Sequence, residues 1–523
     1  MAIQISGSTV IHDSQDVQVS GVVTATSFHG DASQLTNLPA AGSSLQATAS
    51  GTLSDGSTVI VNTDGTVSVV AQTGSASPSP GTSVVFDTDA LIYNQVVYDS
   101  STQKVVIVWH DQGNSNRGTA IVGTVSGTSI SFGSPVIFNS SGTSQPSAIY
   151  DSSNQKVVVA YKNDGNNGYG TAIVGTVSGT SISFGSPTVF ESASSYGFKL
   201  AYDSTNSKVV IAYVDNGYHY TNPNYNSGTA VVGTVSGTSI SFGSPVIFNT
   251  YITDQIAITY DSTNDKVVIA YREYANSNYG TAVVGTISGT SISFGSEVVF
   301  ESSNTEDIAA VYDPVNDKIV LAYADRGNSW YGTAVIGTVS GTSISFGTPV
   351  IFESAEIDYV NMIYDPTVGK VVITYMDKDN SRYGTAILGT VSGTSINFDT
   401  PAVFNSAYTL YMSIAFDSTN NKVVIAYQDR GNGNKATAVV LSHNGNLSNN
   451  LTSENFIGIS DGAYTNGQTA TVQLIGSVDD AQSGLTPGSK YYVQNDGTLS
   501  TTAGSPSVLA GKAISSTKLA IKG

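Results

Sequence analysis

Seven carboxylates at equivalent positions are the most prominent candidates for chemistry in this sequence. Each follows a Tyr or Phe at the end of an apolar stretch and precedes Ser or Pro: Asp99, Asp151, Asp203, Asp261, Asp313, Asp365 and Asp417. Such acids could act in proton transfer, but catalysis does not require one acid to be repeated in every copy. An Asp that accepts a hydrogen bond from the backbone two residues further on explains the pattern. We therefore predict that these carboxylates form turns and that none is catalytic.

A second polar series follows the most apolar stretch of each copy. Its members are Asp111, Asn163, Asp215, Glu273, Asp325, Asp377 and Asp429. Carboxylates gathered at one end of a channel could attract a cation. The amide of Asn163 interrupts the charge, and an acidic side chain at a strand end can also cap the loop that follows. We favour the capping role and predict no metal site here.

The other polar residues give little support for metal binding or catalysis. The chain has no Cys, and its His residues do not stand at the spacing of metal ligands: they are His12, His29, His110, His219 and His443. The turns at Asp64 and Asp496 lack the remaining oxygen ligands of a calcium loop. No nucleophile elbow and no phosphate-binding loop is present. We predict no metal, no cofactor and no enzymatic activity, although two acids from separate loops could still cleave a glycosidic bond.

The composition excludes several classes of protein. The 523 residues include 39 acidic and 20 basic side chains, for a net charge of −19. A protein that neutralises many phosphates needs clustered Lys and Arg, so nucleic acid and anionic membrane surfaces are not expected as partners. No apolar run approaches the ~18 residues of a membrane helix, so no membrane insertion is expected. Strings such as 208–213 nevertheless supply enough apolar residues for a folded core.

A repeat of 52 residues organises most of the chain. Successive Tyr-Asp or Phe-Asp pairs stand 52 residues apart, except for one interval of 58 residues between Asp203 and Asp261. Each copy carries four stretches, A to D: one ending in Tyr-Asp, an apolar one such as 208–213, an alternating one such as 228–234, and a short one such as 239–242. Branched and aromatic residues at these spacings indicate strands. Four strands per ~50 residues is typical of a blade of a β-propeller.

The ends of the repeat array predict a closed ring. The seventh copy stops after strand C at 438–441, and an unmatched strand-D fragment, Gly81–Asp87, precedes the first copy. In a ring, this N-terminal strand completes the last blade and covers its edge, whereas an open β-solenoid, the main alternative, needs no such exchange. We therefore predict an all-β fold: a seven-bladed β-propeller with four-stranded blades, closed by the N-terminal strand and flanked by small β modules.

The predicted domain boundaries follow from this assignment. The propeller occupies 81–442. An N-terminal attachment or oligomerisation segment, 1–45, and a β-hairpin module with a Pro/Ser linker, 46–80, precede it. A linker, 443–453, leads to a small C-terminal β domain, 454–523. The first segment is too small and polar to hold a core alone, so we expect it to pack on another protein or on copies of itself in a homo-oligomer, with a trimer favoured.

Two terminal segments resemble parts of known proteins. Gly21–Asp31, followed by Leu35–Leu38, resembles a segment near the N-termini of tailed-phage fibre and other virion proteins, those of cyanophages in particular. Ser483–Val493, with Val508–Ala513 and Lys518–Leu519, is similar to a small C-terminal module of the same proteins. The resemblance implies a structural protein on the exterior of a bacteriophage virion, which assembles with other virion proteins. It does not extend to the propeller, and it carries over no functional residue.

The repeats differ mainly on one face of the predicted ring. In an antiparallel blade, the A–B and C–D turns share one face, which is nearly uniform in sequence and which we name the uniform face. The B–C loops and D–A crossings share the other, the variable face. Aromatic planes beside amides and carboxylates suit the recognition of a sugar or a protein partner. The candidate binding residues on the variable face are Tyr218, His219, Tyr220, Asn222, Asn224, Tyr225, Trp330, Arg117 and Arg382.

Other aromatic residues on the variable face have a structural explanation as well. A Tyr precedes Gly-Thr in four blades, where it can cover the blade edge: Tyr169, Tyr279, Tyr331 and Tyr383. The crossings add Tyr196, Phe198, Tyr251, Tyr359, Tyr408 and Tyr411. We expect a tail fibre, spike or decoration protein whose propeller recognises a host-surface glycan or protein receptor. A purely architectural virion component and a glycan-degrading enzyme are the alternatives.

Overall fold

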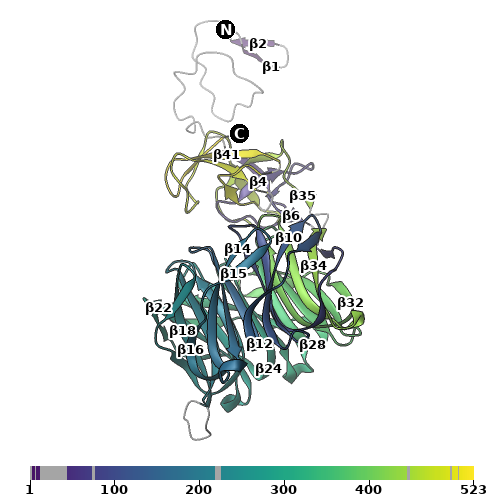
Figure 1. Ribbon diagram of the computed structural model, residues 1–523. Helices are drawn as coiled ribbons and strands as arrows, with labels where there is room; N and C mark the ends of the chain where they lie inside the picture. Colours follow the sequence, from purple (N-terminus) through teal and green to yellow (C-terminus); the bar gives the residue numbers. More distant parts are fainter. Residues whose placement is uncertain are drawn as a thin grey trace. The chain divides into compact units, whose positions relative to one another are not determined.

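The described part of the structure, a computed structural model, comprises residues 3–5, 8–11, 44–73, 77–217, 225–444, 448–494, 497–504 and 506–522 (Figure 1). The chain forms two compact units, residues 74–447 and residues 1–73 together with 448–523. Strands dominate both units. The helices in the described residues are short 3₁₀ segments, η1 (Asp164–Asn166), η2 (Tyr274–Asn276), η3 (Arg326–Asn328) and η4 (Arg430–Asn432). None of these described helices has the length and apolar character needed to cross a membrane.

Residues 77–217 and 225–444 form a closed ring of seven blades. Strand B is β9 (Lys104–Asp111), β13 (Lys156–Asn163), β17 (Lys208–Asn216), β21 (Lys266–Glu273), β25 (Lys318–Asp325), β29 (Lys370–Asp377) and β33 (Lys422–Asp429). Strand C is β10 (Arg117–Ser126), β14 (Tyr169–Ser178), β18 (Tyr225–Ser236), β22 (Tyr279–Ser288), β26 (Tyr331–Ser340), β30 (Tyr383–Ser392) and β34 (Lys435–Asn444). Strand D begins with β11 (Ser129–Phe132), β15 (Ser181–Phe184), β19 (Ser239–Phe242), β23 (Ser291–Phe294), β27 (Ser343–Phe346) and β31 (Ser395–Phe398).

Long strands connect each blade to the next. They are β8 (Val84–Asp99), β12 (Val136–Asp151), β16 (Thr188–Asp203), β20 (Val246–Asp261), β24 (Val298–Asp313), β28 (Val350–Asp365) and β32 (Ala402–Asp417). The first half of each continues strand D of one blade, and the second half is strand A of the following blade. In β12, residues 136–142 pair with β10, and residues 143–151 pair with β13. The predicted D–A crossing is therefore continuous β structure.

The N-terminal strands close the last blade, as predicted. β34 pairs with β7 (Ser77–Pro80) from Leu441↔Pro80 to Asn444↔Ser77, and with the start of β8 from Ala438↔Val84 to Lys435↔Ala90. The segment Ser75–Pro80, which we predicted to be a linker, thus contains the outer edge strand β7. Prolines are tolerated at an edge because a strand there need not donate every N–H to a neighbour.

Apolar side chains between neighbouring blades form the core of the ring. Strand B is buried on both faces: the side chains of 209–213 in β17 are all 0% exposed. At the end of this run, the ring of Tyr213 lies 5.3 Å from that of Phe190. Equivalent aromatic pairs recur around the ring, among them Phe138–Tyr161, Phe248–Tyr271, Phe300–Tyr323, Phe352–Tyr375, Phe404–Tyr427 and Phe86–Trp109. Each blade is therefore stabilised by the next one rather than by a core of its own.

Neighbouring blades also approach closely at their glycines on the uniform face. A Cβ on Gly243 would lie 1.9 Å from the carbonyl oxygen of Thr290, which belongs to the C–D turn of the next blade. The same approach recurs at Gly81, Gly133, Gly185, Gly295 and Gly347. A side chain at these positions would force the two blades apart, so glycine is required by space rather than by backbone conformation.

The second unit combines segments from both sides of the propeller. One sheet has the order β3 (Ser44–Thr48), β37 (Thr469–Gln473), β36 (Phe456–Ser460), β4 (Thr58–Val61), β5 (Val67–Val69). Another has the order β38 (Val478–Asp479), β42 (Leu519–Ile521), β41 (Val508–Ala513), β39 (Lys490–Val493), β40 (Leu499–Ser500). In addition, β6 (Gln72–Thr73) pairs with β35 (Ser448–Asn449).

This arrangement differs from the domain boundaries drawn on the sequence. The sequence places 46–80 and 454–523 in separate modules, whereas the structure combines strands from both segments in one sheet. The side chains of Ile60 and Val70 share an apolar cluster with Ile459 and Tyr491. Of the predicted N-terminal segment 1–45, the structure describes β1 (Ile3–Ile5), β2 (Ser8–Ile11), which pair with each other, and the first two residues of β3.

Candidate functional site

The seven Tyr-Asp carboxylates hold turns, as predicted. Asp203 accepts a hydrogen bond from the backbone N–H of Asn206 (2.9 Å) and a second from its side-chain amide (2.8 Å). Asp151, Asp261, Asp313 and Asp417 bind the Asn three residues on in the same way. Asp99 and Asp365 also accept from turn backbone. All seven are at most 1% exposed, so these acids stabilise the uniform face rather than meet a ligand.

The second polar series caps B–C loops, as predicted, at four positions. The side chains of Asp111, Asp325, Asp377 and Asp429 accept hydrogen bonds from backbone N–H groups of the loops that follow, at 2.9–3.2 Å. Across the residues that the structure describes, no group of three or more His, Cys, Asp or Glu side chains is arranged to hold a metal ion.

A residue in the left-handed conformation stands where each B–C loop meets strand C, in six blades just before the strand and in the third blade at the second residue of β18. The residues at this position are Asn116, Gly168, Asn226, Asn278, Trp330, Arg382 and Asn434. Asn and Gly tolerate a positive φ, whereas longer side chains adopt it only at a cost. Trp330 (φ 59°) and Arg382 (φ 61°) are therefore the two strained members, and they stand in adjacent blades. The backbone carbonyl of each accepts an N–H from the next long strand, Ile357 and Thr409 respectively, both at 3.1 Å.

The structure describes four of the nine candidate binding residues. Tyr218, His219, Tyr220, Asn222 and Asn224 lie outside the described residues, and Tyr225 is the first residue of β18. Arg117 is half-buried, and its Nη1 donates to Asn114 Oδ1 in its own loop (3.1 Å). Trp330 is half-buried against the apolar cluster of Ile357, with the Arg326 guanidinium 4.7 Å above its ring. Arg382 is exposed.

Several aromatic residues of the variable face have structural roles. The four Tyr residues that begin strand C, Tyr169, Tyr279, Tyr331 and Tyr383, are each half-buried. Phe198, which the sequence places in a variable crossing, is 3% exposed, and its ring packs at 5.9 Å on that of Phe190. It belongs to the core because the crossing is continuous strand, whose side chains alternate between core and surface.

A second set of left-handed residues surrounds the mouth of the central channel on the variable face. They stand at one equivalent position of the long strands, with φ between 46° and 68°: Tyr93, Gln145, Gly197, Gln255, Asp307, Tyr359 and Tyr411. We name this set the mouth ring. Each residue lies at a bulge where the long strand slips in register against strand B, as between Ser144 and Ser147 in β12. Strained backbone of this kind persists where neighbouring contacts hold it, and it is typical of binding sites.

Side chains of the mouth ring link one blade to the next. Gln145 Oε1 accepts a hydrogen bond from Gly197 N–H (2.7 Å), and Gln255 Oε1 accepts one from Asp307 N–H (3.1 Å). Asp307 Oδ2 in turn accepts from Tyr359 N–H (2.7 Å). From Tyr359 onward, aromatic contacts continue the mouth ring. The side-chain rings of Tyr359 and Tyr411 are 5.4 Å apart, and so are those of Tyr411 and Tyr93. The three tyrosines form a continuous aromatic sector on adjacent blades.

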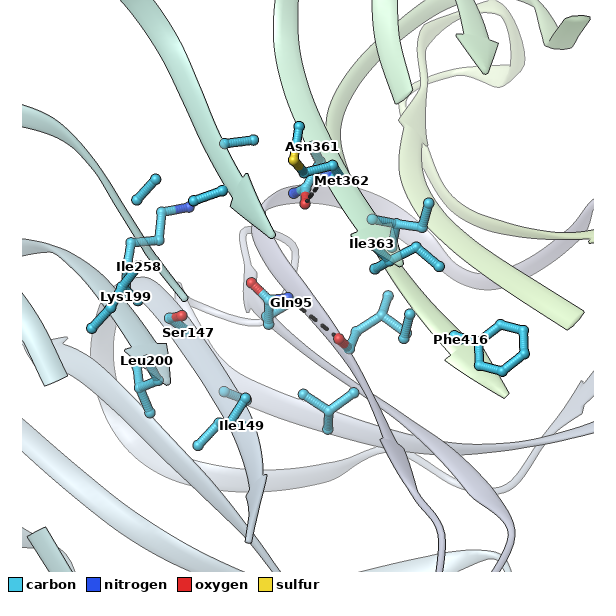
Figure 2. Close-up of a pocket in the computed structure, with 18 of the residues that line it drawn as sticks. Gln95, Ser147, Ile149, Lys199, Leu200, Ile258, Asn361, Met362, Ile363 and Phe416 are labelled. Atoms are coloured by element: carbon cyan, nitrogen blue, oxygen red, sulfur yellow. Dashed lines mark hydrogen bonds between the residues drawn. The ribbon is translucent and has the colours of Figure 1, made fainter. Parts of the chain in front are cut away.

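The mouth ring borders a cavity of about 430 Å³. Below it, strand A of every blade lines a channel with a further cavity of about 350 Å³. Figure 2 shows Gln95, Ser147, Lys199 and Asn361 on separate strands around this space. These four residues also line the cavity at the mouth. Amide, hydroxyl and ammonium groups therefore stand within reach of one ligand, beside the tyrosines.

Burial alters two of the three charged groups that line the mouth cavity, Asp307 and Lys199, whereas the third, Asp254, pairs with Arg272. Burial raises the pKa of Asp307 to about 6, an effect that Asp358 and Glu306 reinforce and that the N–H of Tyr359 and Lys378 oppose. Burial lowers the pKa of Lys199, while the negative charge of Asp307 raises it. Both groups lose hydration at the mouth, so each is disposed to interact with a ligand of opposite charge or with a hydroxyl group.

All the arginines of this protein stand on the variable face. They are Arg117, Arg272, Arg326, Arg382 and Arg430, at the end of strand B, in the B–C loop or at the start of strand C. Arg272 is buried and forms ion pairs with Asp254 (2.6 Å) and Glu306 (2.9 Å). Arg326 also pairs with Glu306 (2.7 Å). Arg382 and Arg430 instead both lie over the ring of Tyr408, each with its guanidinium carbon 4.9 Å from the ring centre.

The sequence interpretation placed Tyr359 and Tyr411 among the aromatic residues of the variable crossings, but it missed Tyr93, the ring that these residues form, and Arg430. The ring position is occupied by Tyr, Gln, Gly or Asp in different copies, so no residue type marks it. A signal was nevertheless present at Arg430, since arginine occurs only in and beside the B–C loops. A comparison of the arginine positions across the repeats would have identified Arg430 as a candidate binding residue.

No family model and no curated protein matches the sequence. Among solved structures, the chain is similar to the BP39L lectin from Burkholderia pseudomallei, with 9% sequence identity and a TM-score of 0.50, over 69% of this chain and 98% of the lectin. It is also similar to a leech intramolecular trans-sialidase complexed with 2,7-anhydro-Neu5Ac, with 10% identity and a TM-score of 0.39, over 69% of this chain and 68% of that one. At such low identity a likeness speaks only of the fold. The closed ring of strands and the match to the lectin together show that this chain contains a β-propeller.

Proposed function

We propose that the propeller is a recognition head that binds a carbohydrate at the mouth of its channel and does not cleave it. The observation that carries the proposal is the aromatic sector of Tyr359, Tyr411 and Tyr93 at the edge of the mouth cavity. Sugars present flat C–H faces that stack on aromatic rings and hydroxyl groups that need hydrogen-bond partners. Asn361 and Gln95 line the same cavity and provide such partners.

Further support comes from the position of the mouth within the fold. Tyr93 is 42% exposed, so its ring offers a free surface that the core does not need. A cavity of about 430 Å³ falls within the size range of ligand sites, about 300–1,000 Å³. The lectin likeness is compatible with sugar binding, but it contributes only the fold.

An array of host-surface polysaccharides and their oligosaccharides tests the proposal. We expect the purified chain to be retained by at least one sugar, and we expect Tyr93→Ala to lower its affinity about tenfold, as for the loss of one stacked ring. Tyr251→Ala is the matched control, because Tyr251 is 57% exposed on the same face and does not line the cavity. Release of shortened sugars into solution would show an enzyme instead. If no sugar on the array retains the chain, a purely architectural role in the virion becomes the favoured alternative.

We also propose that the chain is carried on the exterior of a tailed-phage virion, as a fibre, spike or decoration protein. The resemblance of Gly21–Leu38 and Ser483–Leu519 to segments of such proteins supports this location. Peptides of this chain in purified particles, together with antibody labelling of their surface, would test it. Light scattering of the purified chain would test the homo-oligomer, for which a trimer is expected. Absence of the chain from the particles would refute the location.

A further inference from the structure

Arg382, Tyr408 and Arg430 form a compact basic and aromatic cluster on the variable face. The two guanidinium groups lie over the same ring, each 4.9 Å from its centre, so they are separated by less than about 10 Å. Both arginines are exposed, and Tyr408 is half-buried. They come from the B–C loops of two adjacent blades, with Tyr408 on the long strand β32 between them. We name these three residues the arginine cluster.

The arginine cluster differs from Arg272 and Arg326 of the same face in its lack of an acidic partner. Those two arginines each form ion pairs with carboxylates. Within the described ranges, no carboxylate lies within ion-pair distance of Arg382 or Arg430. In a chain with 39 acidic and 20 basic residues, two like charges brought together without a counter-charge are unexpected. The arrangement leaves guanidinium N–H donors available to an external anion.

The backbone at Arg382 provides independent support. Arg382 occupies the left-handed position that Asn holds in four other blades and Gly in one. An Asn would satisfy this position with less strain. Strained residues that the fold does not need are typical of ligand sites. Arg382 nevertheless occupies this position, with an exposed side chain whose guanidinium lies over the ring of Tyr408.

The arginine cluster also borders the aromatic sector of the mouth. Burial raises the pKa of Tyr411, and the positive charge of Arg430 opposes this effect. Tyr408 and Tyr411 also stand three residues apart on the same strand, β32, so a sugar stacked on the aromatic sector would have the arginine cluster beside it.

We propose that the arginine cluster is a subsite for the acidic group, carboxylate or sulfate, of an anionic polysaccharide. This inference rests on the proposed carbohydrate binding and specifies its ligand class. The ring of Tyr408 holds the two guanidinium groups close together through cation–π contacts, and these groups bind the acidic substituent through charge-assisted hydrogen bonds.

Titration calorimetry with paired oligosaccharides tests the subsite. One pair is oligogalacturonate and its methyl ester, which differ in the carboxylate. The other is a κ-carrageenan oligosaccharide and its desulfated form, which differ in the sulfate. We expect the full chain to bind the acidic member of at least one pair about tenfold more tightly than its neutral form, with an affinity that falls as salt is added. The pair that shows the preference identifies the acidic group.

The decisive variant is Arg382→Asn combined with Arg430→Gln. Asn is the common residue of the repeat at position 382, so this variant is expected to fold, which circular dichroism verifies. It should lose the preference for the acidic sugar and keep the affinity for the neutral one. Arg326→Gln is the matched control, since Arg326 is on the same face but is paired with Glu306, and it should keep the preference.

The outcomes separate this inference from the proposed function. Equal binding of acidic and neutral sugars, or an unchanged preference in the double variant, refutes the subsite and leaves carbohydrate binding intact. Binding to no oligosaccharide refutes both. If single-stranded DNA of equal charge is bound in an Arg382-dependent manner while the acidic sugars are not, the anion is not a sugar and the inference is wrong.

Discussion

At the scale of single residues, the departures from the repeat are informative. Asp399 replaces the glycine that approaches the next blade in the other copies. The blade that follows is the last one, which lacks the C–D turn whose carbonyl meets this glycine in the other copies, and Asp399 pairs with Lys370 at 2.6 Å. Leu441 likewise replaces a glycine of strand C. In the other blades a Cβ at that glycine would meet an Ile of strand D, as at Gly233 and Ile240. Leu441 is 0% exposed and occupies this space in the closing blade.

The glycines at the blade contacts lead to the first prediction. Gly243→Ala places a Cβ against the Thr290 carbonyl oxygen, and we expect it to lower the free energy of unfolding by about 1–3 kcal/mol, as for an overpacked core. Denaturant unfolding followed by circular dichroism measures the change. Ser244→Ala, at the adjacent exposed residue, is the control and should stay within about 0.5 kcal/mol. Equal stability of the two variants would contradict the close approach.

Asp307 leads to a prediction about pH. Burial raises its pKa in the folded protein from 3.8 to about 6. Between about pH 4 and 6 the folded state therefore binds more protons than the unfolded state. The contribution of Asp307 to the free energy of unfolding consequently falls as pH rises. Asp307→Asn keeps a hydrogen-bond acceptor for Tyr359 and removes the titration. We expect its stability relative to the wild type to increase from pH 4 to pH 7.

Thermal unfolding at a series of pH values measures this difference. Asp379→Asn, which removes an exposed carboxylate from a loop of the same face, is the control for the loss of a charge at the surface. A constant difference between Asp307→Asn and the wild type across the range would mean that Asp307 titrates at its ordinary pH.

At the scale of elements, closure of the ring depends on the start of β8. Val84 and Phe86 pack in the cluster between the last and the first blade, and the Phe86 ring lies 5.4 Å from that of Trp109. Burial of two apolar side chains contributes about 1.5–3 kcal/mol each, against a net stability of about 5–15 kcal/mol for a domain. A ring has no independent blades, so this loss acts on the whole propeller.

Deletion of Ser83–Asp87 is therefore expected to destabilise the entire propeller in one transition. Calorimetry of the full chain would show the propeller melting at a lower temperature. Val85→Ala, which shortens a side chain 38% exposed in the same strand, is the control and should have little effect. A melting curve unchanged by the deletion would disprove closure by this strand.

The sequence predicted the ring better than it predicted its binding site. The repeated Tyr-Asp pairs and the spare segment Gly81–Asp87 were sufficient for the blade count and the closure, because identical local patterns imply identical local structure. The mouth ring was hidden, since a positive φ at Gln145 or Tyr359 leaves no periodic sign in the residue types. The pairing of β3 with β37 was also hidden, because contacts between segments far apart in sequence leave no local pattern.

At the scale of the whole molecule, the propeller is an insertion into the second unit. Within the ring, Ser77 is paired with Asn444, so its two ends are adjacent. Within the other unit, Gln72 is paired with Asn449, so the two ends that flank the insertion are adjacent there as well. Each unit can therefore be closed by a short connection that leaves its own strand pairs intact.

A chain in which a short Gly/Ser linker replaces residues 74–447 is expected to fold. Its two sheets retain all of their described strands, and chain termini this close tolerate joining. The expected result is a cooperative melting transition and dispersed amide signals in NMR spectra. A matched chain that also lacks β37 should be unfolded, because β37 separates β3 from β36 in the first sheet. If the first of these two shortened chains were unfolded as well, this unit would depend on the propeller for its stability.

The anchoring of the B–C loops explains how this protein can acquire new binding preferences. Asp325 and Asp429 fix the start of their loops, and a left-handed residue fixes the end of each. The copy with six additional residues keeps the register of its neighbours between strands B and C as far as Asp215↔Ser227, and it shifts register only at the following pair, Asn216↔Tyr225. Segments between these two anchors can therefore be exchanged between blades. New binding specificities can evolve on this face, or be grafted onto it, while the strands that carry the loops stay the same.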